Sequence, residues 1–570
     1  MRSTRWMAPL FLLAPGLLGC HVPGAAPAAS VAAPVRFADV TAAAGIRFTH
    51  HNGAAGKKMM PETTGSGCAF LDYDNDGWDD ILLIDSRAYA PVAPMLALYH
   101  NNHDGTFTEV TEKAGLTVKG YGMGCAIGDY DNDGWEDIYL TCIGPNHLFH
   151  NNHDGTFTDV TRKAGVAGAP VGMGGTLRWK WSSSCAWVDY NNDGKLDLFV
   201  CNFVKWSPQT DVFCGRPGGE KQYCAPRAYD GTPNTLYRNN GDGTFTDVSR
   251  QVGLTGSIGK GWGVVPWDFN GDGWVDLAVA NDLSANFLFL NQAGKRFQET
   301  ALQAGIAMGD NASPKAGMGI DVADWQNNGR CGLLIGNFSN EKLSLFCDDG
   351  SGLFTDMADR VGMGETSLHF LTFGLFFFDY DLDGWQDAFI ANGHIDDMVH
   401  QFETSITYAE RPLLYHNEQG QTFREVGLQA GPPFQSEYVL RGCAYGDIDN
   451  DGFPDILVVP NNNQPAHLWR NLGGNGNHWI RFKLIGHSSN RDGIGAIVTV
   501  RARGMTQRQC VKSGSSFLSA SSLRILFGLG QATQVDEAVI RWPSGHEDRV
   551  QNLPIDRLVV LEEGKGRAGR

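Results

Sequence analysis

One Asp-rich loop occurs seven times in this chain and constrains its fold more than any other feature. The copies begin at seven aspartates, 55 to 79 residues apart: Asp72, Asp129, Asp189, Asp268, Asp324, Asp379 and Asp447. In the first copy, residues 72–80, carboxylates occupy positions 1, 3, 5 and 9, and Gly77 occupies position 6. Gly permits a sharp turn, and such a turn directs several oxygens at one point, which suits Ca²⁺. The repeat therefore predicts a series of similar calcium sites.

Two familiar calcium motifs do not match this loop. An EF-hand has Glu at position 12 between two helices, whereas this chain has apolar residues there, as at Leu83 and Leu140, within strand-like runs. The Gly-Gly-x-Gly-x-Asp repeat of calcium β-helices does not occur in the sequence. Solvated Asx turns remain the alternative, but such turns do not need Asp at position 9. The pattern favours a calcium site in a strand–loop–strand unit.

The seven copies differ in charge. Copies one, two, six and seven have all four carboxylates, whereas copies three and four have Asn191 and Asn270 at position 3. The fifth copy, residues 324–332, has lost the carboxylates at positions 3, 5 and 9. Because clustered carboxylates repel one another without cations, we expect about six structural Ca²⁺ ions and none in the fifth copy. Chelation should then destabilise the protein.

A second motif recurs between the loops and completes a four-strand unit. It runs over residues 98–110, 148–160 and 236–248, with weaker copies later in the chain. Four short strands per repeat are typical of a β-propeller blade. Residues 37–41 resemble the last strand of a repeat, and the seventh repeat lacks that strand, so the N-terminal segment can complete it. The predicted fold class is all-β, with a seven-bladed β-propeller over residues 35–475; six full blades with remnants are the competing count.

The chain changes character near His478, where basic residues begin to outnumber acidic ones. Alternating or apolar runs at 479–485, 495–503, 523–527, 535–542 and 558–561 predict a small C-terminal β-sandwich over residues 476–565. Its basic charge is opposite to that of the acidic remainder, which favours docking onto the propeller.

The first residues predict export. Arg2 and Arg5 precede an apolar stretch over residues 7–18, and Leu17-Leu18-Gly19-Cys20 resembles a bacterial lipobox. We therefore predict a lipoprotein signal peptide over residues 1–19, lipidation of Cys20 and a flexible tether over residues 20–34. An ordinary secretory leader is the alternative. The predicted location is the bacterial cell envelope, lipid-anchored at the outer membrane and facing the periplasm or the surface.

The cysteines fit an oxidising compartment, where disulfides persist. Cys214 and Cys224 bracket a short segment of the long third interval, and we predict a disulfide between them. Cys331 and Cys347 could also face each other across a hairpin. Four further cysteines each lie four residues before the first Asp of a loop, which favours small buried core residues; these are Cys68, Cys125, Cys185 and Cys443.

The loops resemble FG-GAP/VCBS repeats, the blades of integrin α-subunit propellers. The tail resembles the ASPIC/UnbV domain in residues 490–496, 513–518, 527–530 and 541–545, and the order of the parts is similar to that in bacterial members of the cartilage acidic protein family. The resemblance implies ligands at positions 1, 3, 5, 7 and 9 of the six intact loops, with a main-chain carbonyl at position 7. These ligands are Asp72, Asp74, Asp76, Trp78, Asp80, Asp129, Asp131, Asp133, Trp135, Asp137, Asp189, Asn191, Asp193, Lys195, Asp197, Asp268, Asn270, Asp272, Trp274, Asp276, Asp379, Asp381, Asp383, Trp385, Asp387, Asp447, Asp449, Asp451, Phe453 and Asp455.

An enzyme on a propeller scaffold, such as a polysaccharide lyase or glycoside hydrolase, is the alternative function. Its candidate residues are His50, His51, Asn52, Glu62, His369, Asn392, His394, Asp396 and Asp397. The sequence contains no Gly-x-Ser-x-Gly elbow or phosphate loop, so no catalytic residue is assigned. The formal net charge of −18 opposes association with nucleic acid.

The sequence thus predicts a calcium-binding lipoprotein of the cell envelope. The resemblance implies that it acts as an adhesion-like module for a protein or glycan ligand. By analogy with integrins, partners would use the rim opposite the calcium loops, where the insertions over residues 203–233 and 394–412 are expected. We expect a monomer that meets the membrane only through its N-terminal lipid.

Overall fold

The computed structural model describes residues 35–87, 94–168, 171–173, 176–178, 180–215, 218–309 and 311–567. These residues belong to one compact unit. The predicted signal peptide, tether and lipidated Cys20 lie outside the described residues. In the described part, no helix is long and apolar enough to cross a membrane.

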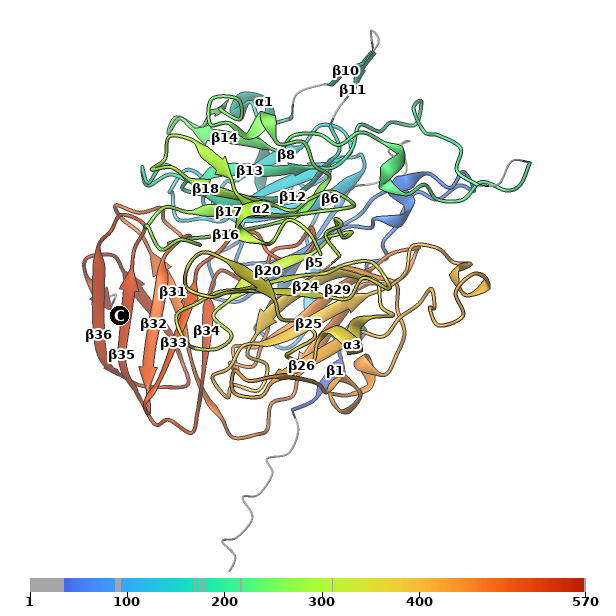
Figure 1. Cartoon of the computed structure of the whole chain (residues 1–570). Helices are drawn as coiled ribbons and strands as arrows, with labels where there is room; N and C mark the ends of the chain where they lie inside the picture. The colour runs from blue at the N-terminus through green and yellow to red at the C-terminus, as the bar shows by residue number, and fades with distance from the viewer. Residues whose placement is uncertain are drawn as a thin grey trace, which may run out of the picture. The chain divides into compact units, whose positions relative to one another are not determined.

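Seven four-stranded antiparallel sheets occur within the described ranges up to Asn471 (Figure 1). The first three are β2 (Cys68–Leu71), β3 (Asp80–Ile84), β4 (Leu96–Asn101) and β5 (Phe107–Glu109); β6 (Gly122–Gly128), β7 (Asp137–Cys142), β8 (His147–Asn151) and β9 (Phe157–Asp159); β12 (Ser182–Val188), β13 (Asp197–Asn202), β14 (Thr235–Asn239) and β15 (Phe245–Asp247). The next three are β16 (Gly261–Trp267), β17 (Asp276–Asn281), β18 (Phe287–Asn291) and β19 (Phe297–Glu299); β20 (Ile320–Ala323), β21 (Gly332–Ile335), β22 (Ser344–Asp348) and β23 (Phe354–Asp356); β24 (Thr372–Phe378), β25 (Asp387–Asn392), β26 (Leu413–Asn417) and β27 (Phe423–Glu425). The last consists of β28 (Leu440–Gly446), β29 (Asp455–Pro460), β30 (His467–Asn471) and β1 (Phe37–Asp39).

The connections between these sheets contain little helix. A hairpin of β10 (Val171–Met173) and β11 (Thr176–Arg178) and three single-turn helices, α1 (Thr161–Ala164), α2 (Ala301–Ala304) and α3 (Gly364–Ser367), are the regular elements among the described connections besides short 3-10 turns. The repeat region is therefore all-β, as the sequence predicts.

The N-terminal strand pairs with the last repeat. β1 runs antiparallel to β30, with Phe37 opposite Asn471 and Asp39 opposite Trp469. Neighbouring sheets contact one another through their first strands, and β2 of the first sheet also contacts β28 of the last. The two ends of the repeat region therefore meet.

Asparagines at the ends of the third strands link neighbouring sheets. Asn151 Nδ2 donates to the Tyr73 carbonyl of the preceding sheet at 2.7 Å, and Asn101 Nδ2 donates to the Ile448 carbonyl of the last sheet at 2.8 Å. Four more asparagines repeat this contact: Asn239, Asn291, Asn417 and Asn471. The fifth sheet has Asp348 instead. Buried amides that are satisfied in this way strengthen the sheet-to-sheet contact.

The antiparallel order gives the repeat region two rims. The loop rim contains the seven Asp loops, each of which joins a first strand to a second strand. The insertion rim contains the connections from second to third strands, which include residues 203–233 and 394–412. In Figure 1 the segment over residues 203–233 projects away from the C-terminal sheets.

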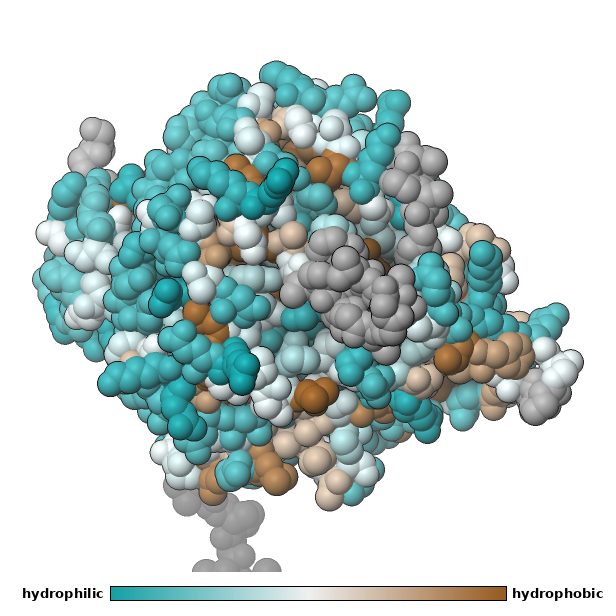
Figure 2. All heavy atoms as spheres, turned by 90° about the horizontal axis from the view of Figure 1, so that it is seen from above, coloured by the Kyte–Doolittle hydropathy of each residue, from teal (hydrophilic) through white to brown (hydrophobic). Residues whose placement is uncertain are grey.

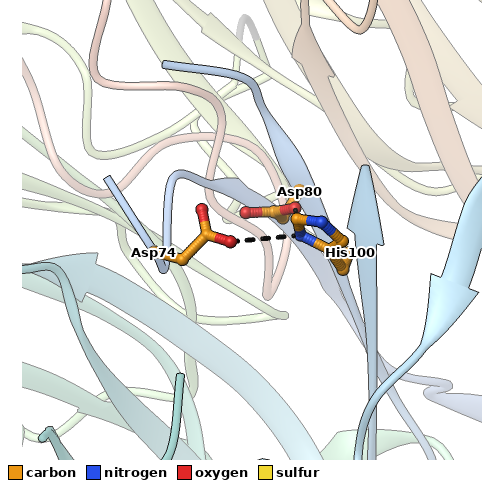
Figure 3. Close-up of side chains that lie close together, drawn as sticks. All are labelled: Asp74, Asp80 and His100. Atoms are coloured by element: carbon orange, nitrogen blue, oxygen red, sulfur yellow. Dashed lines mark ion pairs between the residues drawn. The ribbon is translucent and has the colours of Figure 1, made fainter. Parts of the chain in front are cut away.

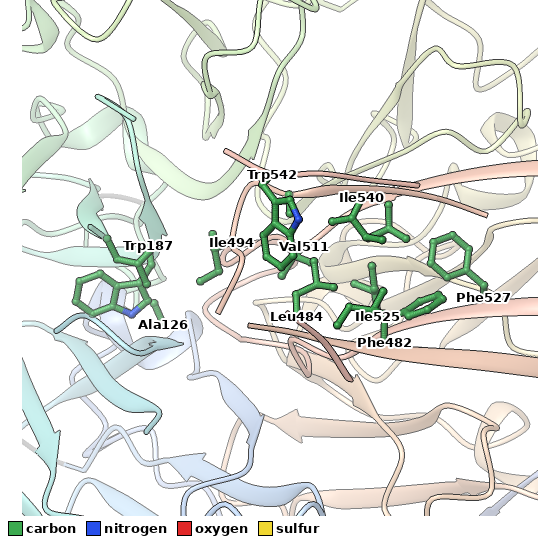
Figure 4. Packing of buried hydrophobic residues seen from close by; sticks show 14 of the residues in the cluster. Ala126, Trp187, Phe482, Leu484, Ile494, Val511, Ile525, Phe527, Ile540 and Trp542 are labelled. Carbon is green, nitrogen blue, oxygen red and sulfur yellow. The ribbon is translucent and has the colours of Figure 1, made fainter. Parts of the chain in front are cut away.

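The C-terminal region consists of two further four-stranded sheets, ordered β34-β31-β37-β38 and β33-β32-β35-β36. Their bounds are β31 (His478–Ile485), β32 (Ile497–Ala502), β33 (Met505–Cys510), β34 (Ile525–Gly530), β35 (Val535–Arg541), β36 (Glu547–Leu553), β37 (Leu558–Glu562) and β38 (Gly566–Arg567). All five predicted strands are present, whereas β33, β36 and β38 were not predicted. Both sheets contribute to one apolar cluster that continues into the repeat region, where Trp187 and Ala126 lie beside Ile494 (Figure 4).

A segment of the C-terminal region lies among the first strands of the repeat sheets. This inserted segment, residues 512–522, forms a parallel bridge from Ala520 to Ala69 and an antiparallel bridge from Ser516 to Ile320. Gly67 provides the room, because a Cβ there would lie 1.7 Å from the Leu518 carbonyl oxygen. The inserted segment thus joins the two regions through main-chain contacts.

The cysteines are partly as predicted. Cys214 and Cys224 form the predicted disulfide. The four cysteines before the Asp loops are free and buried, which confirms their interpretation as core residues. The pairing of Cys331 with Cys347 is wrong: both are free, because Cys347 lies opposite Gly332 in the β21–β22 pair. That one-residue offset turns the two side chains toward opposite faces.

Candidate metal centres

The Asp at position 9 joins the loop to the second and third strands of each intact unit. In the second loop, Asp137 Oδ2 accepts the Tyr130 N–H at 3.2 Å and Oδ1 accepts the Asn151 N–H of the third strand at 2.8 Å. The same pair of contacts occurs at five other position-9 residues: Asp80, Asp197, Asp276, Asp387 and Asp455. All six are almost completely buried. The six loops therefore share the same hydrogen-bond arrangement at position 9.

The other carboxylates shape the turn. Asp129 at position 1 accepts the N–H groups of Asp133 and Gly134 at 3.0 and 2.6 Å, and Asp133 at position 5 accepts the Trp135 N–H at 3.0 Å. The position-7 N–H donates to the position-5 carboxylate in all six loops, from Trp78, Trp135, Lys195, Trp274, Trp385 and Phe453. These bonds hold the carboxylates at positions 1 and 5 along one bend.

Acidic oxygens converge in several loops, and a histidine of the third strand joins them. Figure 3 shows His100 of β4 beside Asp74 and Asp80, with its Nδ1 3.2 Å from Asp74 Oδ2 and 3.4 Å from Asp80 Oδ1. His150 and His416 occupy the same place in the second and sixth loops. In such clusters, one donor atom per residue lies within 4.8 Å of each of the others. Ca²⁺ bonds of about 2.4 Å span that separation, so the donors fit a cation of this size.

Three position-3 aspartates have an oxygen without a hydrogen-bond partner. Asp74 Oδ1, Asp381 Oδ1 and Asp449 Oδ1 are buried and accept no hydrogen bond from the described residues. Burial also raises the pKa of Asp80, Asp137 and Asp383 to about 7. Buried carboxylates without a partner lack a compensating positive charge. A hard cation would supply that charge.

The intact loops fall into three groups. Loops one, two and six combine four carboxylates with a third-strand histidine. In loops three and four, Asn191 and Asn270 at position 3 donate to the position-5 carboxylates at 3.2 and 3.0 Å. In loop seven, Arg470 takes the histidine position and pairs with Asp449.

Two arginines of the C-terminal region reach the loop rim. Arg481 donates to Asp79 Oδ2 at 2.6 Å and to Asp447 Oδ2 at 3.1 Å, and Arg524 pairs with Asp72 and with Asp79. All of these side chains are buried. Asp72 and Asp447, predicted calcium ligands at position 1, therefore also anchor the C-terminal region, and Asp79 at position 8 was not predicted to have a role.

Sequence reasoning assigned no role to the third-strand histidines. Their signal was the recurring Leu-x-His-Asn motif at Leu98, Leu148 and Leu414, whose Asn residues form the links between sheets. Among the position-7 tryptophans, Trp78 stacks on His103 with ring centroids 4.6 Å apart.

The candidates for catalysis lie mainly at the insertion rim. The buried Arg441 donates to the carbonyls of Thr63, Gly393 and His394. It thereby joins the segment that contains Glu62 to the segment that contains His394. Burial lowers the pKa of His50 and of His394 to about 4. These histidines are therefore uncharged near neutral pH.

The remaining candidates have structural contacts or are exposed. His51 Nδ1 lies 3.0 Å from Asp85 Oδ2, and Lys58 Nζ lies 3.0 Å from Asp397 Oδ1. Asn52 Nδ2 donates to the Glu62 carbonyl, and the Asp396 N–H donates to His394 Nδ1. Asn392 accepts the Thr372 hydroxyl, and His369 is exposed.

Comparison with known families identifies both regions. The FG-GAP-like repeat matches residues 72–140, 129–200, 209–279, 268–331 and 379–458, which together are more than half of the chain, so this is an FG-GAP repeat protein. The ASPIC and UnbV family matches residues 486–568. The chain belongs to the family of cartilage acidic protein 1, which has this domain architecture.

Individual relatives are distant. Cartilage acidic protein 1 of Mus musculus is 23% identical over 368 residues, which are 64% of this chain and 51% of the relative. The human protein is 22% identical over 343 residues, 60% of this chain and 39% of the relative. The matches thus span about half of these relatives or less.

Two solved structures are also similar. An Agrocybe aegerita lectin that recognises terminal N-acetylglucosamine is 15% identical with a TM-score of 0.37, covering 72% of this chain and 94% of its own. A rhamnogalacturonan lyase of Bacillus licheniformis is 11% identical with a TM-score of 0.34, covering 74% of each chain.

Proposed function

We propose that the protein is a calcium-stabilised binding module. In this proposal the seven repeat sheets are the blades of a closed β-propeller, the C-terminal sheets form a β-sandwich, and six intact loops each hold one Ca²⁺. The FG-GAP repeats with an ASPIC/UnbV domain fit a protein-binding module. The ions would be structural, because each loop connects two strands of its own blade.

The observation that carries the calcium proposal is the convergence around unpartnered oxygens. Asp74 Oδ1 lies buried without a hydrogen bond, within a cluster that joins the loop to Asp80 and to the third-strand His100. A cation at this point would hold three strands of one blade together. The links from Asn101 and its counterparts would then pass this rigidity to the neighbouring blade.

The ligand face is proposed to be the insertion rim. The C-terminal region covers part of the loop rim through Arg481 and Arg524, which leaves the opposite rim for a partner. Exposed apolar side chains occur on the two insertions there, at Val212, Phe213, Met398 and Phe402. On the face drawn in Figure 2, apolar side chains form separate patches among polar ones, as expected of a surface in contact with water.

The Cys214–Cys224 disulfide and the relationship to cartilage acidic protein 1 indicate an exported protein. We propose that it is a monomer tethered to the cell envelope through a lipid on Cys20, with no nucleic-acid partner. Its ligand would be a protein or a glycan.

Metal analysis combined with thermal unfolding tests the proposal. The purified full-length protein should contain about six Ca²⁺ per chain. Its Tm should fall by ten degrees or more in excess EDTA, and added Ca²⁺, but not Mg²⁺, should restore it, since Mg²⁺ requires smaller and more regular coordination. A metal-free protein whose Tm is unchanged by EDTA would contradict the calcium role.

A further inference from the structure

A cavity of about 280 Å³ lies at the insertion rim. Five aromatic rings from different sheets or their connections line it: Phe203, Tyr223, Trp262, Phe338 and Phe373. Phe517 at the tip of the inserted segment packs against two of them, with ring centroids 5.3 Å from Trp262 and 5.1 Å from Phe373. The C-terminal region therefore supports the aromatic wall of this cavity.

Two carboxylates share the lining with these rings. Asp282, only 9% exposed, accepts the Trp262 indole N–H at 3.3 Å, and Glu341 accepts the Ala316 N–H at 2.7 Å. Within the described part of the chain, neither forms an ion pair with Lys or Arg at up to 4.0 Å. The basic residue among the lining side chains is Arg227, which is exposed to solvent.

An unpaired carboxylate is unfavourable beside aromatic rings. Burial raises the pKa of Asp282 to about 7, which reflects the poor solvation of its charge. Buried charges in proteins are usually paired. A cation entering the cavity would supply the missing partner for Asp282 and Glu341.

Aromatic rings of this rim already hold the chain's own cations. Lys58 Nζ lies 4.6 Å from the centroid of the Tyr223 ring, which also lines the cavity. Arg441 Cζ lies 3.9 Å from the centroid of Phe373. A cation over an aromatic face is attracted by the ring quadrupole, and cages of several rings bind ammonium groups. The rings at this rim are thus compatible with a further cation.

We propose that this cavity binds the ammonium group of a ligand, with Asp282 and Glu341 as counter-ions and the five aromatic rings as its walls. The inference rests on the proposed binding function and specifies the group recognised at the insertion rim. A lysine side chain of a protein partner and a free alkylamine both carry this group. The volume suits one extended side chain, because ligand pockets for larger molecules begin at roughly 300 Å³.

Calorimetric titration of the calcium-loaded full-length protein tests the inference. The cationic probes are n-butylammonium, for a free amine, and Nα-acetyl-lysine amide, for a lysine side chain. The neutral probes are n-butanol and the Nε-acetylated form of the same lysine derivative. Asp282→Asn keeps the shape and removes the charge. Asp230→Asn is the matched control, because Asp230 lies in the same rim's insertion and its side chain is 78% exposed.

The wild-type protein should bind at least one cationic probe at least tenfold more tightly than its neutral counterpart. Asp282→Asn should lower that affinity tenfold or more, and Asp230→Asn should change it less than twofold. Binding of the lysine derivative alone would assign the site to a protein partner, and binding of butylammonium alone would assign it to a free amine.

Absence of cation binding, or equal binding of neutral probes and of the Asp282→Asn variant, would overturn the inference. The melting temperature with and without Ca²⁺, measured on the same samples, keeps this result separate from the proposed function. If Ca²⁺ raises the melting temperature but no amine binds, only the inference about the cavity is contradicted and the proposed function is not.

Discussion

The fifth and sixth Asp loops share one backbone bend, but their side chains at positions 3 and 5 differ in their hydrogen-bond partners. In both, the position-1 aspartate, Asp324 or Asp379, accepts the N–H groups of positions 5 and 6 at 2.8 to 3.1 Å. In the fifth loop, Asn328 Nδ2 donates to Gln326 Oε1 at 3.2 Å, so positions 3 and 5 bond to each other. In the sixth loop, Asp381 and Asp383 cannot do so, and Asp381 Oδ1 has no hydrogen-bond donor among the described residues.

This difference distinguishes the residues that form the turn from those that would bind a metal. The bend forms with a single carboxylate, so Asx geometry alone accounts for positions 1 and 6. The additional carboxylates at positions 3, 5 and 9 produce like-charge repulsion in a buried place, where it is poorly screened. A bound cation would offset this repulsion in the intact loops, whereas in the fifth loop Asn328 bonds to Gln326 instead.

The largest effect is expected at position 9 of the sixth loop. Asp387→Ala removes a proposed calcium ligand and leaves the Tyr380 and Asn417 N–H groups without acceptors. Each unsatisfied buried group costs about 1–3 kcal/mol, so the free energy of unfolding should fall by about 3 kcal/mol or more in Ca²⁺. Urea unfolding measures this loss. The exposed Asp154→Ala should stay within about 0.5 kcal/mol of wild type, and a similar loss there would undermine the comparison.

The link between the sixth and fifth sheets should matter next. Asn417 Nδ2 donates to the Trp325 carbonyl of the fifth sheet and to the Gln386 carbonyl. Asn417→Ala should lower the free energy of unfolding by about 2 kcal/mol, because buried carbonyls lose their donors. The same urea titration applies, with the exposed Asn152→Ala as control. Equal values for the two variants would mean that the link contributes nothing.

Position 3 offers a smaller and more specific contrast. Asp381→Asn should weaken calcium binding at one site about tenfold, or about 1.4 kcal/mol, because the amide reduces the charge around the ion. Gln326→Ala in the fifth loop should alter stability equally with and without Ca²⁺. Calcium titrations followed by calorimetry distinguish the two variants. A calcium-dependent effect of Gln326→Ala would show that the fifth loop also binds the ion.

A separate expected effect concerns the pH dependence of stability in the chelated protein. Burial raises the pKa of Asp80, Asp137 and Asp383 to about 7, above the unfolded value of about 3.9. The folded state therefore binds more protons between these values, and the free energy of unfolding should decline as pH rises from about 4 to about 7. Bound Ca²⁺ should suppress this decline. A chelated protein that becomes more stable over this range would contradict the assignment.

Sequence periodicity predicted the local units because their signals are local. The strands on either side of each Asp loop, the pairing of Phe37 with the seventh repeat, and the Cys214–Cys224 disulfide all follow from short motifs. The strand β36 was not predicted, because it is mostly exposed and polar and its apolar pattern is too weak to detect.

The contacts between repeat units could not be predicted from short sequence motifs. Asn151 bonds to Tyr73, 78 residues away, and Arg481 bonds to Asp79, 402 residues away. Such partners depend on how sheets are placed around one another. His100 likewise faces Asp74 only because β4 lies beside the loop. The position of these side chains is set by packing rather than by spacing along the chain.

The most direct test is anomalous scattering from crystals of the full-length protein grown with Tb³⁺ in place of Ca²⁺. The account predicts six peaks, one in each intact loop, located about 2.4 Å from side-chain oxygens at positions 1, 3 and 5, and none within residues 324–332. A peak of equal height in the fifth loop, or none beside Asp74, Asp131 and Asp381, would contradict it.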